Sequence, residues 1–104
     1  MFICDERIYD NKKFFVKQKE NSIVKNAICQ YLTDSNYQTS VIACAETDLL
    51  TEKEIDNASS VQCYSDGEFE WTSEITYLFK NYDLKLNDKF IETIRSIRVI
   101  CVQI

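Results

Sequence analysis

The chain contains a single glycine and no proline, so few of its positions favour a sharp reversal of the backbone. The glycine, Gly67, lies between two short runs, 61–64 and 68–71, in which apolar and polar residues alternate. Glycine readily adopts the positive φ angle that a tight hairpin turn requires. The pattern therefore predicts a β-hairpin that turns at this glycine and directs Phe69 and Trp71 toward the core.

Three other segments carry apolar residues at the spacing of one face of an α-helix. They predict helices over residues 21–34, over residues 72–81, and from Asn87 to about residue 97. Each begins at a polar residue whose side chain is able to cap the first turn.

Short runs of β-branched and aromatic residues predict four extended segments, which are 7–10, 13–18, 39–45 and 98–104. The run 39–45 is apolar enough to be a buried strand. Residues 51–54 match the capping-box pattern, which predicts a short helical turn that ends near Asn57. The mixture of elements predicts a single α+β domain over residues 1–104, with a small, mostly antiparallel sheet and about three helices packed on it.

Several function classes lack the residues that their chemistry needs. No histidine is present, which removes the commonest general base and the usual zinc ligand. The five cysteines are widely spaced, so we expect reduced and mostly buried thiols. We therefore expect no enzyme, no cofactor and no metal.

Nothing in the sequence indicates a membrane or a secreted protein. No apolar run approaches the roughly 18 residues that a membrane-spanning helix needs. The first residues lack the basic and then apolar pattern of a secretory signal. We expect a soluble, cytoplasmic protein.

The formal net charge is -5, and the whole negative excess lies between residues 46 and 74. This stretch holds nine acidic residues against Lys53 alone, which makes nucleic acid a poor partner because phosphate binding needs basic charge. A basic protein would be attracted by the complementary potential, whereas the alternative is a solvated acidic surface that serves solubility. The predicted partner-binding residues are Asp48, Glu52, Glu54, Asp56, Tyr64, Asp66, Glu68 and Glu70. Tyr64 is included as an aromatic anchor, because tyrosine is enriched at interface hot spots.

Residues 66–90 contain the frame D-G-x-x-x-W, then ITYLFKNY, then L-x-x-x-F. This frame resembles a recurring pattern in small bacterial proteins encoded beside polymorphic toxins, some of which act as immunity proteins in contact-dependent growth inhibition. Thr72 and Asn87 stand where that family has proline. The matching positions are Asp66, Gly67, Trp71, Tyr77, Tyr82, Leu86, Phe90 and Ile91.

The resemblance implies an immunity protein that binds a cognate toxin domain and neutralises it. Many such toxins are nucleases with basic substrate sites, and an acidic surface would block such a site because carboxylates replace the phosphates. The alternative is a generic acidic binding module or a phage-type inhibitor of a nucleic-acid enzyme. Two less favoured hypotheses are a hydrolase that pairs Asp66 with Glu70, and a metal site formed by Asp66, Glu68 and Glu70. The oligomeric state is not predicted.

Overall fold

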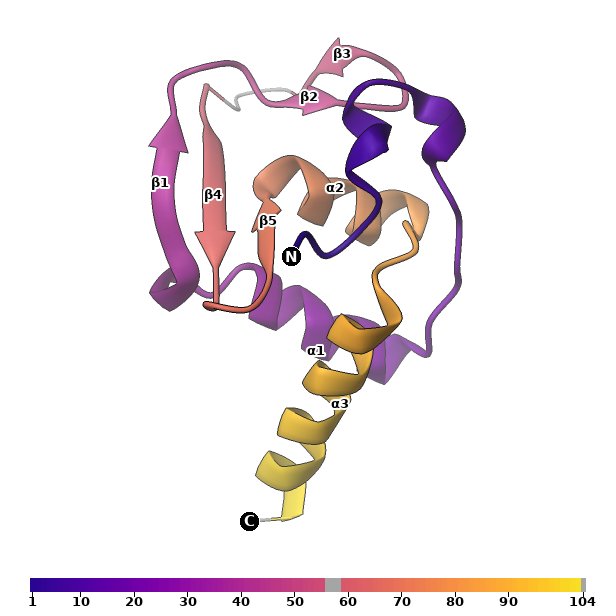
Figure 1. The fold of residues 1–104 in the computed structure, drawn as a ribbon, viewed down its shortest axis with the longest axis vertical. Helices are drawn as coiled ribbons and strands as arrows, with labels where there is room; N and C mark the ends of the chain where they lie inside the picture. The colour runs from indigo at the N-terminus through magenta and orange to yellow at the C-terminus, as the bar shows by residue number, and fades with distance from the viewer. Residues whose placement is uncertain (56–58, 104) are drawn as a thin grey trace.

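The computed structural model describes the backbone of residues 1–55 and 59–103, and the side chains of this part as far as residue 96. It confirms an α+β fold with a small antiparallel sheet and three α-helices (Figure 1). The strands are β1 (Gln38–Ile42), β2 (Thr47–Asp48), β3 (Lys53–Glu54), β4 (Val61–Ser65) and β5 (Glu70–Thr72). The α-helices are α1 (Ser22–Leu32), α2 (Ser73–Tyr82) and α3 (Asp88–Gln103). Short 3-10 helices are η1 (Glu6–Tyr9), η2 (Lys12–Phe14) and η3 (Ser35–Tyr37).

The main sheet has the order β1-β4-β5, and every pair in it is antiparallel. The β4–β5 pair is the hairpin that the sequence predicts, and Gly67 lies in its turn with a φ angle of 97°. A second, two-stranded sheet joins β2 to β3 at the opposite end of the molecule (Figure 1). The β4–β5 turn lies beside α1 and α3, whereas β2 and β3 lie beyond α2.

The hydrophobic core is centred on the indole of Trp71, which is 1% exposed. Its Nε1–H donates a hydrogen bond of 2.9 Å to the carbonyl oxygen of Leu32, the last residue of α1. Its ring stacks on that of Tyr64, with centroids 5.8 Å apart, and lies 6.0 Å from that of Phe90 in α3. Trp71 therefore joins the sheet to two helices, and the prediction that Phe69 and Trp71 face the core is confirmed.

The first residues of the chain cover the open edge of β5. Phe2 forms a parallel bridge with Glu70, whose N–H donates to the carbonyl oxygen of Met1 at 2.8 Å and whose carbonyl accepts from Ile3 at 3.1 Å. Ile3 is completely buried in the core. This pairing joins residues far apart in sequence, and no local pattern in the chain predicts it.

Three predicted helices are confirmed, and side chains cap each of them. Asn21, Thr72 and Asn87 accept hydrogen bonds from the first turns of α1, α2 and α3, respectively. At the C-terminal end of α2, Asp83 adopts a left-handed conformation, with a φ angle of 57°, and forms an ion pair with Lys25 of α1. Caps and this ion pair fix where the helices begin and end, since the chain has no proline to do so.

Three predictions of extended or helical structure are wrong, and a fourth is correct only in its second half. Residues 7–10 lie largely in the 3-10 helix η1, which Asp5 caps, where the pattern predicts an extended segment. In the segment 13–18, the first two residues belong to η2, which Asn11 caps, whereas the chain from Phe15 onward is extended and pairs with residues 83–85 through an antiparallel bridge between Lys17 and Leu84. Residues 51–54 form the end of a turn and the two residues of β3 and not a helix, because Glu52 has a φ angle of 62°. Residues 98–103 continue α3, so the expected strand at 98–104 is absent up to residue 103.

The strand expected at 39–45 exists as β1, but it is exposed along its whole length and not buried. The predicted helical end near Asn57 lies outside the described residues. A β-branched run is typical of a strand, but its burial depends on which other elements cover it. Here only β4 pairs with β1 among the described residues.

Substitution of Trp71 by Phe should lower the free energy of unfolding by about 2–3 kcal/mol, because it removes buried volume and leaves the Leu32 carbonyl without its donor. Urea denaturation followed by circular dichroism measures this change. The matched control is Ile23→Ala on α1, which is 78% exposed and should change stability by less than about 0.5 kcal/mol. Equal effects of the two variants would contradict the central role of Trp71.

Candidate functional site

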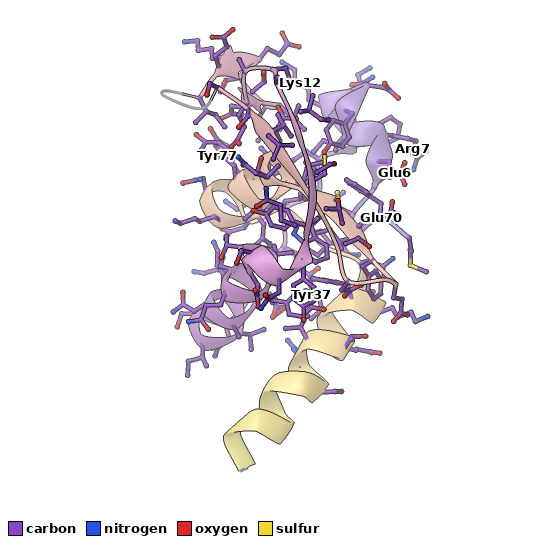
Figure 2. All side chains as sticks on the ribbon, turned by 90° about the vertical axis from the view of Figure 1, so that its left-hand side faces the viewer. Glu6, Arg7, Lys12, Tyr37, Glu70 and Tyr77 are labelled. Carbon is purple, nitrogen blue, oxygen red and sulfur yellow. The ribbon has the colours of Figure 1, made fainter. Side chains whose placement is uncertain are left out.

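The acidic stretch does not form one continuous surface. Asp48, Glu52 and Glu54 belong to the β2–β3 hairpin, whereas Asp66 belongs to the β4–β5 turn at the other end of the molecule (Figure 1). Glu70 lies on the side that carries Glu6 and Arg7, opposite Tyr77 (Figure 2). Asp56 lies outside the described residues. The fold thus divides the predicted partner-binding residues among three parts of the surface.

The largest group of carboxylates surrounds the β2–β3 hairpin. We call it the β2–β3 cluster, and it consists of Glu46, Asp48, Glu52, Glu54 and Glu74. Two hydrogen bonds join the residues around β2 to the start of α2. Glu46 accepts from the hydroxyl of Ser73 at 2.7 Å, and Glu74 of α2 accepts from the N–H of Thr47 at 2.7 Å. Glu46 and Glu74 are absent from the predicted set of partner-binding residues, because their proximity arises from the packing of α2 on β2.

Asp48 is a structural residue of this cluster, since it is only 5% exposed. One of its oxygens accepts from the backbone N–H groups of Leu50 and Thr51, and the other accepts from the hydroxyl of Tyr82 at 2.6 Å. Burial alone would raise the pKa of Asp48, but these hydrogen bonds outweigh it and hold the pKa below its ordinary value. The same bond raises the pKa of Tyr82 to about 12.

Glu74 has the opposite shift. Burial raises the pKa of this carboxyl above its ordinary value, and the nearby charge of Glu46 adds to the rise, although the hydrogen bond from Thr47 opposes it. The two glutamates therefore place like charges close together at half-buried positions. Such an arrangement opposes folding at neutral pH, because the charged form of Glu74 is disfavoured in the native state.

An open groove of about 500 Å³ lies beside the cluster. The rings of Tyr77 and Tyr82 have their centroids 6.2 Å apart in an edge-to-face arrangement. Glu54 is exposed, and Asp48 is buried. The lining residues are Asp48, Thr51, Lys53, Glu54, Ile55, Tyr77 and Tyr82. Because hydrogen bonds occupy Asp48, the groove offers a cationic side chain two tyrosine rings and the carboxylate of Glu54, which lies beside Lys53 in the same lining.

Asp66 plays in the β4–β5 turn the role that Asp48 plays in the β2–β3 turn. It accepts from the N–H groups of Glu68 at 2.9 Å and Phe69 at 2.7 Å, and from the hydroxyl of Tyr31 at 2.6 Å. Burial alone would raise its pKa, but the hydrogen bond from Tyr31 and those from the backbone hold the pKa below the ordinary value. Asp66 therefore stabilises the β4–β5 turn and joins it to α1.

The other predicted residues at this end differ in their freedom to reach a partner. Tyr64 is half-buried and stacked on Trp71, so packing restricts its ring. Glu68 is exposed and forms an ion pair of 3.1 Å with Lys89 of α3. Glu70 is exposed, while its backbone pairs with the N-terminal segment. Of the eight predicted residues, Glu52, Glu54 and Glu70 are the described carboxylates with no intramolecular side-chain bond.

The described residues contain no group of three or more potential ligands arranged to hold a metal ion. Asp66, the residue that both the hydrolase and the metal hypotheses need, is occupied by three donors. Within the same part of the chain, Cys4, Cys29, Cys44 and Cys63 are free thiols. Burial, together with the charges of Asp5 and Glu6, raises the pKa of Cys4 to about 12, so this thiol is unreactive at neutral pH.

No family model, curated protein or solved structure matched the chain. None of the helices that the structure describes is both long and apolar enough to cross a membrane. The geometry of the β2–β3 cluster and its groove is therefore the observation from which a function can be argued.

Substitution of Asp66 by Asn should lower the free energy of unfolding at pH 7 by about 1–2 kcal/mol. The pKa of Asp66 is lowered in the native state, so its contribution is full above the unfolded value near 4 and is lost as the pH falls through the folded value. The variant should consequently lose less stability than the wild type between about pH 4 and pH 2. Chemical denaturation across this pH range measures both effects.

Two further variants make this test specific. Tyr31→Phe removes the shared hydrogen bond, and its effect should be less than additive with that of Asp66→Asn in a double-mutant cycle. Glu70→Gln removes an exposed carboxylate and should leave the acid limb of the stability profile unchanged. If the effects of Tyr31→Phe and Asp66→Asn are additive, the hydrogen bond between these two side chains contributes nothing to stability.

Proposed function

We propose that the protein is a cytoplasmic immunity protein that binds the basic surface of a cognate toxin domain. The observation that carries the proposal is the β2–β3 cluster, in which five carboxylates gather around one hairpin whose single basic residue is Lys53. Such a concentration of one sign of charge attracts a surface of opposite sign and speeds its encounter. The resemblance of residues 66–90 to immunity proteins agrees with this role.

The exposed members of the cluster support a role in binding. Glu52 and Glu54 form no side-chain bond with another described residue, so they are available to a partner. Glu46 and Glu74 are half-buried and accept hydrogen bonds from Ser73 and Thr47, so they join α2 to the β2 region while they add negative charge beside the hairpin. Burial and the charge of Glu46 raise the pKa of Glu74, so this part of the cluster costs stability at neutral pH.

The groove beside the cluster supports contact with lysine or arginine. Tyr77 and Tyr82 supply aromatic faces, and Glu54 supplies an exposed carboxylate near them. A cation that enters the groove would gain both cation–π and charge-assisted contacts. A nuclease toxin has basic groups at its substrate site, and the cluster would occupy them in place of phosphate.

The gene that lies directly upstream tests the class of function. We expect it to encode a secreted protein whose C-terminal domain is toxic and forms a stable complex with this chain when the two are produced together. Growth of cells that express the toxic domain should be restored by this chain. The absence of such a domain, or the lack of a complex, would contradict the proposal and favour a generic acidic binding module.

The variant Glu52→Lys/Glu54→Lys should weaken the complex by about tenfold at roughly 0.05 M salt and by less at roughly 0.5 M salt, because ions screen exposed charges. Isothermal titration calorimetry with the upstream toxin domain measures the affinity. The control Glu6→Lys/Glu92→Lys makes the same change in net charge at exposed positions outside the cluster, and it should have a smaller effect.

A third pair of substitutions tests the location of the contact. The variant Glu68→Lys/Glu70→Lys changes two other exposed carboxylates of the predicted set, which lie away from the β2–β3 hairpin. Its effect should be no larger than that of the control pair. If it alone abolishes binding, the contact lies at the β4–β5 hairpin and the assignment to the β2–β3 cluster is wrong.

A further inference from the structure

Strand β1 is exposed on all five of its residues and forms an edge of the main sheet. No described strand other than β4 pairs with the backbone N–H and C=O groups of β1. Val41 is 53% exposed and Ile42 is 51% exposed, so two neighbouring β-branched side chains lie at this edge of the sheet. Figure 1 shows β1 as the outermost strand, beyond β4. An edge of this kind is a template for a further strand.

The two edges of this sheet differ in a way that points to β1. The N-terminal segment covers the edge of β5, through the bridge between Phe2 and Glu70 and the hydrogen bonds beside it. Among the described residues, nothing performs the same role for β1. The chain therefore covers the edge at β5 with its own residues and leaves the edge at β1 available to another strand.

The sequence of β1 lacks the chemical protection of an open edge. Edge strands in monomeric proteins are protected by lysine or other charged residues, by proline, by a bulge or by being very short. Residues 35–45 contain no charged residue and no proline, and the neighbouring strand β4 is also uncharged. The irregularity between Gln38 and Ser40 lies at the start of β1, so Ser40 to Ile42 remain a regular strand.

We propose that β1 pairs in an antiparallel direction with β1 of a second copy of the chain. A two-fold axis across the strand would join the two sheets into one of six strands with the order β5-β4-β1-β1-β4-β5. The lack of charge favours this occupant, because two chains of net charge -5 can meet at β1 without bringing like charges together. A basic partner, by contrast, finds no carboxylate on this strand to recognise.

This dimer would be weak and would respond to salt in a distinctive way. A seam of at most five residues, of which Ser40 to Ile42 are regular, lies below the size of most stable interfaces, so the dissociation constant should be micromolar or higher. The bodies of the two copies repel each other, and salt screens that repulsion, so salt should strengthen the dimer. Salt should weaken the binding of a basic toxin domain. The two proposals therefore predict opposite responses to salt, and the failure of one can be told from the failure of the other.

Sedimentation equilibrium of the purified full chain, from micromolar to near-millimolar concentration, tests the proposal. We expect a monomer–dimer equilibrium that shifts toward the dimer as salt rises from about 0.05 M to about 0.5 M. Hydrogen exchange at low and high concentration should show added protection confined to β1. A monomer at all concentrations, or protection elsewhere, would overturn the proposal.

Substitutions in the strand locate the interface. Val41→Lys places like charges across the seam twice in a two-fold dimer and should raise the dissociation constant by about tenfold or more. Ile42→Lys should act in the same direction, and Ile23→Lys on α1 is the matched control because Ile23 is also exposed. Circular dichroism checks that each variant is folded. If the β1 variants leave the dimer intact, or weaken only a complex with the toxin domain, β1 is not the site of self-association.

Discussion

The structure depends above all on the burial of Trp71. Its indole N–H holds the end of α1 through Leu32, while its ring contacts Tyr64 in the sheet and Phe90 in α3. Among the described side chains, the indole is buried more completely than those of Asp48 and Thr76, and the hydrogen bond removes the cost of burying its N–H. With the sheet and two helices tied to one side chain, the small core acquires a defined arrangement.

Two aspartates complete this arrangement by fixing the turns at opposite ends of the molecule. Asp48 and Asp66 each accept two backbone N–H groups and one tyrosine hydroxyl, from Tyr82 and Tyr31, respectively. The acidic stretch is thus of two kinds. Asp48 and Asp66 stabilise turns as ionised acceptors, and the exposed Glu52, Glu54 and Glu70 remain available for a partner, so net charge alone overstates the surface that can bind.

Elements with strong local patterns could be predicted, and elements that depend on distant contacts could not. The three helices and the Gly67 hairpin follow from periodicity and from one flexible residue. The run 98–103 predicts a strand because β-branched residues favour strands, but it is helical because it continues α3. The N-terminal segment beside β5 and the exposure of β1 arise from the tertiary arrangement, which no local window contains.

The candidate site shows the same division. The sequence by itself determined that negative charge is concentrated between residues 46 and 74 and that histidine chemistry is absent, since both follow from composition. Only the tertiary structure decided which carboxylates share a surface. Packing of α2 on β2 brings Glu74 to Glu46, while tyrosine hydroxyls bind Asp48 and Asp66 within the fold. The physical reason is that charge is a property of each residue, whereas burial and proximity are properties of the folded chain.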